Sequence, residues 1–150
     1  MAQGSEWVTG MITLSDEWVE IDTMDPATLL MARRPRTDYG CMPVVLVKRL
    51  LRAKKGIEEG VYAILASSVG ENPTCRVLDV GGTSLDGHPA VVAMFTYSTE
   101  TQNMTQMLYY VAPEGSSADY VLAFAAATAD FGPTARAFTD IVASFRLEEA

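Results

Sequence analysis

The chain has 150 residues, of which 49% are hydrophobic and 20% are charged, and its formal net charge is −8. This length predicts one domain spanning residues 1–150, and the apolar fraction is too high for a disordered chain. A pI near 4.5 opposes binding to a phosphate backbone, so we expect no nucleic-acid partner.

The N-terminus lacks the basic and apolar regions of a signal peptide, and the longest apolar stretch, residues 120–129, is too short for a membrane helix. We therefore expect a cytoplasmic protein without membrane insertion, although a domain trimmed from a secreted parent would look the same. Cys41 and Cys75 have no metal-ligand spacing. We interpret them as small half-buried residues, and the sequence leaves open whether they pair.

In the first half of the chain, alternating apolar residues bounded by turn residues predict strands at 11–14, 18–21, 29–33 and 44–51. A helix is predicted over 57–69, with two acids in its first turn and Gly70 in the left-handed position after its end. Its apolar residues share one helical face: Ile57, Val61, Ile64, Leu65 and Val69.

In the second half, strands are predicted at 76–80, 90–97, 104–111 and 120–127. Residues 81–84 are interpreted as a flexible connection, followed by a tight turn at Asp86 and Gly87. A closing helix is predicted to be capped by Asp130, with Pro133 in its first turn. Its inner side is formed by five apolar residues: Phe131, Phe138, Ile141, Val142 and Phe145.

Short turns between successive strands indicate antiparallel pairing, and the helices do not follow every strand. The predicted fold class is therefore α+β, with a single antiparallel β-sheet flanked by two main helices.

Four features resemble the PsbP-like superfamily: the opening segment 10–18, the mid-chain helix, the turn at 86–90 that leads into a long strand, and the end of the last helix at 141–145. That superfamily includes the Mog, DcrB and LpqN-type domains, and the Ala-rich closing section looks closest to its actinobacterial branch. The resemblance implies an α/β/α sandwich and a bacterial accessory or chaperone-like protein without catalytic residues. The lipobox cysteine of the LpqN type is absent.

The sequence contains no recognisable catalytic, metal or cofactor motif. His88 is the single histidine, and we interpret it as a residue of an exposed turn beside Asp86. A zinc site would need three or four ligands, and neither a phosphate loop nor a dinucleotide fingerprint occurs. We therefore expect no enzyme activity and no cofactor.

The best candidate for a binding site is the segment 33–55, which holds eight of the eleven cations and one acid, Asp38. Such a patch could meet an acidic protein partner if the strands within it pair. The alternative is that these cations neutralise the protein's own acids. The eight residues are Arg33, Arg34, Arg36, Lys48, Arg49, Arg52, Lys54 and Lys55.

A second candidate is an uncovered sheet face that presents Met94 with Thr96, or Met107 with Tyr109. Methionine side chains adapt to different partners, although such residues are more often part of a core. The first hypothesis is thus a non-enzymatic partner-binding domain that uses a sheet face, the basic segment, or both. The alternative is a domain with a small-molecule or lipid pocket between sheet and helix. The sequence leaves homo-oligomerisation open.

Overall fold

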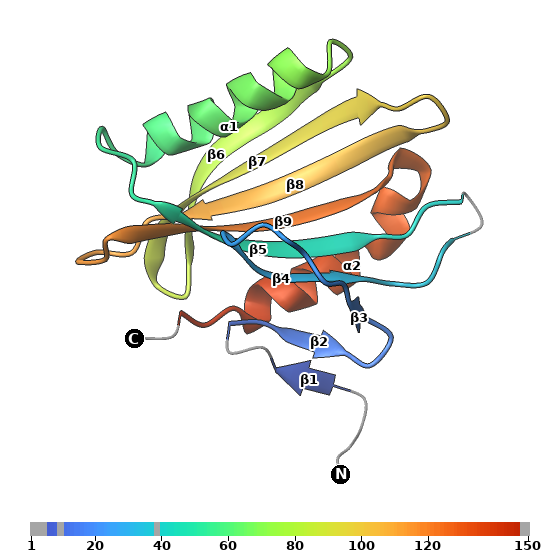
Figure 1. The fold of residues 1–150 in the computed structure, drawn as a ribbon, viewed down its shortest axis with the longest axis horizontal. Helices are drawn as coiled ribbons and strands as arrows, with labels where there is room; N and C mark the ends of the chain where they lie inside the picture. Colours follow the sequence, from blue (N-terminus) through green and yellow to red (C-terminus); the bar gives the residue numbers. More distant parts are fainter. Residues whose placement is uncertain (1–5, 9–10, 38–39, 148–150) are drawn as a thin grey trace.

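The computed structural model describes residues 6–8, 11–37 and 40–147, and Figure 1 shows the arrangement of its helices and strands. The strands are β1 (Glu6–Val8), β2 (Thr13–Ser15), β3 (Val19–Glu20), β4 (Thr28–Arg33), β5 (Val44–Leu51), β6 (Arg76–Leu85), β7 (His88–Ser98), β8 (Asn103–Val111) and β9 (Ala118–Ala127). The helices are α1 (Ile57–Glu71) and α2 (Thr128–Ser144).

Seven strands form one antiparallel sheet in the order β3-β4-β5-β9-β8-β7-β6, and β1 pairs with β2 in a separate two-stranded sheet. Successive hairpins account for β6 to β9, while β5 reaches β9 across the helix α1 and three strands. The predicted fold class, α+β with an antiparallel sheet and two helices, is confirmed.

Strand β9 lies at the centre of this sheet because its apolar residues can be buried on both faces. Leu46 of β5 pairs with Ala123, which in turn pairs with Leu108 of β8. On the opposite face, the next residue, Phe124, is fully buried. A continuous apolar run is typical of a strand covered on both sides.

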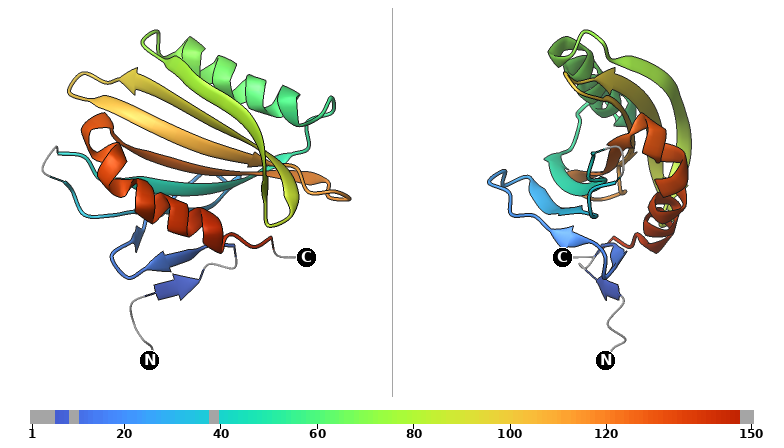
Figure 2. Two further views of the ribbon diagram at one scale, coloured as in Figure 1. Left: turned by 180° about the vertical axis from the view of Figure 1, so that it is seen from behind. Right: turned by 90° about the vertical axis from the view of Figure 1, so that its right-hand side faces the viewer.

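The two helices lie on opposite faces of the sheet (Figure 2). Helix α1 packs over β7 and β8, and helix α2 packs over β8 and β9. Phe138 of α2 contacts three aromatic rings, with centroid distances of 4.5 Å to Phe124, 5.6 Å to Phe131 and 6.5 Å to Trp18. Burial of large aromatic side chains contributes strongly to a core, so this cluster fixes α2 on its face.

The glycines of β6 do not interrupt it, contrary to the prediction of a flexible connection at 81–84. Gly81 pairs with Val92 and Gly82 with Val91, and the strand continues to Leu85. The turn at Asp86 and Gly87 is confirmed, since both residues have positive φ angles of 50° and 78°. Pairing with a long neighbouring strand overrides the weak strand preference of glycine.

Strands β2 and β3 follow one another across a turn at residues 15–18, but they do not pair with each other. Strand β2 pairs with β1 and strand β3 pairs with β4. The reason is the core beneath α2, which buries Ile12, Leu14 and Trp18. The N–H of Thr13 also donates to Ser144 Oγ at 2.9 Å, which holds β2 against the end of α2.

Both helices differ from prediction at their ends. Helix α1 continues through Gly70 to Glu71, so the predicted left-handed position after its end is wrong. Helix α2 begins at Thr128, which places Asp130 and Pro133 inside it rather than at its start. Pro133 cannot donate to the Ala129 carbonyl, but Ala129 is exposed and water can satisfy that group. Neither helix in the described part of the chain has the length and hydropathy to cross a membrane.

Candidate functional site

The eight cations of the segment 33–55 do not form one patch. Strand β4 runs antiparallel to β5, with Arg33 opposite Val44 and Thr28 opposite Lys48. Arg33, Arg34 and Arg36 therefore lie at one end of this strand pair, and the five remaining cations lie toward the other. Asp38 is outside the described residues.

Three of these cations form ion pairs with acids of the same chain. Arg34 Nη2 lies 2.8 Å from Glu17 Oε1, and Lys48 Nζ lies 3.2 Å from Asp25 Oδ2. Arg52 Nε lies 2.8 Å from Asp119 Oδ1. This agrees with internal neutralisation for these three. Partner binding by any of the eight cations stays a prediction.

The pair formed by Lys48 and Asp25 gives a testable pKa. The Ala27 N–H, which donates to Asp25 Oδ1 at 2.9 Å, and then Lys48 hold the pKa of Asp25 below its usual 3.8. Both favour the carboxylate, so these contacts persist above the lowered pKa and are lost as pH falls through it. We expect Lys48→Met to raise the Asp25 pKa without fully restoring it, because the Ala27 bond remains. Carboxyl-carbon NMR titration measures this. The control is Lys54→Met, in which we expect the Asp25 pKa to stay as in the unmodified protein. An unchanged Asp25 pKa in Lys48→Met would contradict the prediction.

Arg52 is part of a buried network centred on Asp119, whose side chain is 1% exposed. Asp119 Oδ2 accepts hydrogen bonds from Tyr110 Oη at 2.6 Å and from the Ala53 N–H at 3.1 Å. Arg52 Nη2 also donates to the carbonyl oxygens of Pro113 and Ala118. Arg52 thus joins the end of β5 to the β8–β9 loop, and we expect reversal of its charge to destabilise the domain as well as to change its surface.

Tyr110 extends this network to helix α1. Burial, followed by the hydrogen bond to Asp119, raises the pKa of Tyr110 far above its usual value, so its hydroxyl remains a donor. A Cβ placed on Gly60 would lie 2.2 Å from Tyr110 Oη. Only glycine allows α1 to approach the sheet this closely.

The candidate residues Met94, Met107 and Tyr109 lie on the α2 side of the sheet. Met94 pairs directly with Met107, and Val92 pairs with Tyr109. Met107 and Tyr109 are half-buried and pack against the core beneath α2, whereas Met94 belongs to neither core cluster. The predicted pairs do share one face, and their role in binding stays a prediction.

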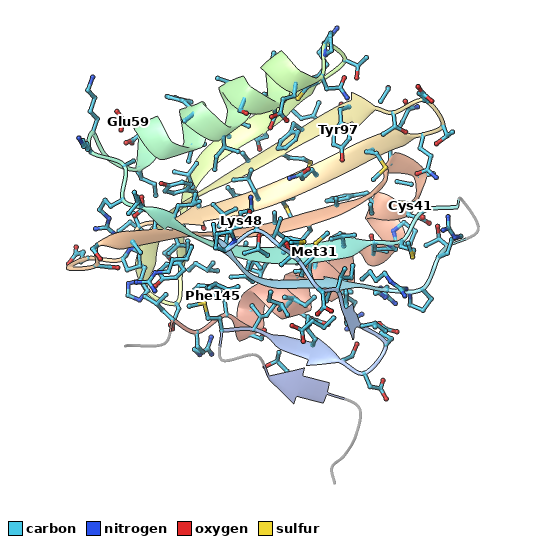
Figure 3. The ribbon with its side chains drawn as sticks, viewed as in Figure 1. Met31, Cys41, Lys48, Glu59, Tyr97 and Phe145 are labelled. Carbon is cyan, nitrogen blue, oxygen red and sulfur yellow. The ribbon has the colours of Figure 1, made fainter. Side chains whose placement is uncertain are left out.

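A second open area lies on the other face of the sheet, beside α1. Because α1 packs over β7 and β8, it leaves β4 and β5 without a covering helix on its face of the sheet (Figure 1). Figure 3 is viewed from this side and shows Met31, Lys48 and Tyr97 on it. We call this area the α1-side surface, and its apolar side chains are half-buried, with Leu46 and Tyr97 packed against the core beneath α1. These side chains are Met31, Val44, Leu46, Tyr97 and Met104.

A pocket of about 360 Å³ adjoins this surface at the C-terminal half of α1. It is lined by Phe95, Tyr97 and Gln106 from the sheet and by Ser68 and Glu71 from the helix. Burial raises the pKa of Tyr97, so its hydroxyl stays protonated and can donate or accept a hydrogen bond. Sequence reasoning missed this area because the uncovered part of a sheet depends on where the helices pack.

His88 and the two cysteines belong to three separate segments, the start of β7 and the loops before β5 and β6. His88 is half-buried at the start of β7, and its side chain makes no hydrogen bond within the described residues. The nearby Asp86 carboxylate instead accepts the Leu147 N–H at 2.9 Å. Cys41 and Cys75 are both free thiols. Among the described residues, no three His, Cys, Asp or Glu side chains are grouped to hold a metal ion.

Comparison with solved structures identifies the fold. Cyanobacterial PsbP (CyanoP) from Synechocystis superposes with a TM-score of 0.70 at 8% identity, covering 99% of this chain and 95% of that one. LpqN of Mycobacterium tuberculosis, described as involved in cell envelope biogenesis, gives 0.66 at 14% identity, covering 87% and 78%. The Ran-binding protein Mog1p of Saccharomyces cerevisiae gives 0.62 at 10% identity, covering 94% and 92%.

No known protein family matches the sequence itself, and no curated protein matches it. The three structural likenesses span most of both chains in each comparison. The protein therefore has the PsbP-like fold, as the sequence motifs indicated.

Proposed function

We propose that this protein is a non-enzymatic, partner-binding accessory domain that docks another protein on its α1-side surface. The observation that carries this proposal is the offset of α1, which leaves the half-buried side chains of Met31, Val44 and Leu46 without a covering helix on two neighbouring strands. Apolar side chains grouped in this way are typical of interaction sites. The fold is shared with a protein named as Ran-binding, which supports a protein as the partner.

The chemistry of the α1-side surface suits an apolar element of the partner. Met31 and Leu46 are direct cross-strand neighbours, and Val44 lies beside Arg33 in the next row. Methionine adapts its shape at low cost, so the surface can fit a helix or an extended segment. Lys48, which is held by Asp25, provides a polar limit on one side.

A single charge on the α1-side surface tests this proposal. We expect Met31→Glu to reduce partner capture from a lysate of the native host at least tenfold, because a carboxylate would be desolvated in the interface. Quantitative mass spectrometry after pulldown measures the captured protein. The Met31 side chain is half-buried and belongs to neither core cluster, so we expect the variant to fold, which circular dichroism verifies.

The matched control is Leu51→Glu, which introduces the same charge at an apolar residue that is 92% exposed and lies on the opposite face of β5 from Leu46. It is expected to capture the partner as the unmodified protein does. The proposal fails if both variants capture the same proteins in the same amounts.

A further inference from the structure

A second pocket, of about 550 Å³, lies on the other side of the sheet, at the end where Met11 and Leu147 approach the β8–β9 loop. Its lining includes Arg49, His88, Tyr120 and Leu147, which come from β5, β7, β9 and the segment after α2. Tyr120 belongs to the core beneath α2, and Leu147 packs against that core. This volume is typical of small-molecule sites.

Main-chain hydrogen bonds hold the walls of this pocket in place. The Arg49 N–H donates to the Ala27 carbonyl at 2.8 Å, and Arg49 pairs with Tyr120 across the sheet. The Arg146 N–H donates to the Met11 carbonyl at 2.8 Å. These two bonds set the backbone of β5 and of the segment after α2 on opposite sides of the pocket in the native state.

Arg49 and Glu114 are the two formally charged residues in the lining, and both are exposed. Lys48 and Arg52, which lie near Arg49 in the chain, are paired with acids, whereas Arg49 has no ion pair in the part of the chain that the structure describes. Asp86, the acid nearest to His88 in the sequence, is bound by the Leu147 N–H and lies 4.0 Å from Arg146.

Apolar side chains complete the pocket. Met11, Leu29 and Leu147 line it together with the ring of Tyr120. Leu29 is 47% exposed, although it is a large apolar residue in a strand. A ligand with an apolar body would cover Leu29 while its polar end reached Arg49.

We propose that this pocket binds a small amphipathic carboxylate. The planar guanidinium of Arg49 can pair with both oxygens of a carboxylate, and such charge-assisted pairs are the strongest hydrogen bonds available to a ligand. His88 and Ser117 supply further hydrogen-bonding groups in the lining. The apolar part of the ligand lies against Met11, Leu29 and Leu147.

Titration of the labelled protein with octanoate, followed by NMR, tests this site. We expect saturable shifts at the amides of Met11, Ser117 and Leu147. Octanol has the same tail without the carboxylate and acetate has the carboxylate without the tail, so both are expected to bind at least tenfold more weakly. Arg49→Gln is expected to weaken octanoate binding at least tenfold, because it removes a charge-assisted hydrogen-bonding pair. His88→Gln provides a second variant and is expected to weaken it about threefold.

The control is Lys54→Gln, which removes one positive charge from an exposed turn outside the pocket. It is expected to bind octanoate within twofold of the unmodified protein. Absence of saturable shifts below the aggregation limit of octanoate would overturn the site. Equal losses in Arg49→Gln and Lys54→Gln would also overturn it, since the effect would then be general electrostatics. Met31→Glu leaves octanoate binding unchanged, which separates this site from the proposed docking surface.

Discussion

Asp119→Ala is expected to destabilise the protein by about 3 kcal/mol or more, a large part of the roughly 5–15 kcal/mol by which small domains are stable. The Tyr110 hydroxyl, on a residue that is 2% exposed, would lose its acceptor, and so would the Ala53 N–H. Arg52 would lose its counter-ion beside the β8–β9 loop. Urea unfolding followed by circular dichroism measures this loss.

Two further variants test whether the loss of stability in Asp119→Ala comes from its buried hydrogen bonds and charge. Asp119→Asn keeps the shape but not the charge, and it is expected to lose less stability than Asp119→Ala because one oxygen still accepts. Asp140→Ala removes an exposed acid of α2, and surface changes of this kind alter stability by less than about 0.5 kcal/mol. If Asp119→Ala unfolded at the same urea concentration as Asp140→Ala, the network would have no stabilising role.

Gly60→Ala is expected to destabilise the protein by about 2 kcal/mol, although alanine is the better helix former by about 1 kcal/mol. The new methyl group would lie 2.2 Å from Tyr110 Oη and 2.3 Å from Tyr110 Cζ. The ring cannot turn away easily, because its hydroxyl is bound to Asp119. Either α1 must move from the sheet or this hydrogen bond must break, and thermal unfolding measures the cost.

Gly70→Ala is the matched control in the same helix. A Cβ at Gly70 would meet nothing within 4 Å, so this substitution is expected to stabilise the protein by about 0.5 kcal/mol through the helix preference and the less flexible unfolded chain. The two substitutions are thus expected to have opposite signs. A stabilising Gly60→Ala would show that α1 does not depend on close contact with Tyr110.

Several elements could be predicted from the sequence because local pattern and tertiary packing agree there. Strand β5 has the predicted bounds, and β9 differs by two residues at its start. In both strands, the local apolar pattern and the burial in the sheet favour the same extended conformation. The glycines of β6 and the start of α2 were predicted wrongly, because a neighbouring strand and a buried helix turn decided those conformations.

The network of Arg52, Tyr110 and Asp119 could not be derived from the sequence, since Arg52 and Asp119 are 67 residues apart. One signal was present. Asp119 begins an otherwise apolar strand, and a buried carboxylate requires partners. The sequence could not say which cation would supply them, because that depends on the pairing of β5 with β9.

The candidate binding residues also depend on strand pairing, which the sequence does not specify. The positive segment 33–55 is evident in the sequence, but antiparallel pairing separates its cations and internal acids bind three of them. Arg49 was among the predicted residues, and the structure places it in a pocket with His88. The α1-side surface depends on the position of a helix along a sheet, which no local pattern encodes.

The contact between the Arg146 N–H and the Met11 carbonyl has a consequence for how the chain reaches its native state. It encloses almost the entire polypeptide in one loop, and the entropy lost on closing a loop grows with its length. Because distant contacts slow folding, this closure is expected late, after the hairpins of β6 to β9 have formed. The same junction should be the first to open in native-state hydrogen exchange, ahead of the central strands.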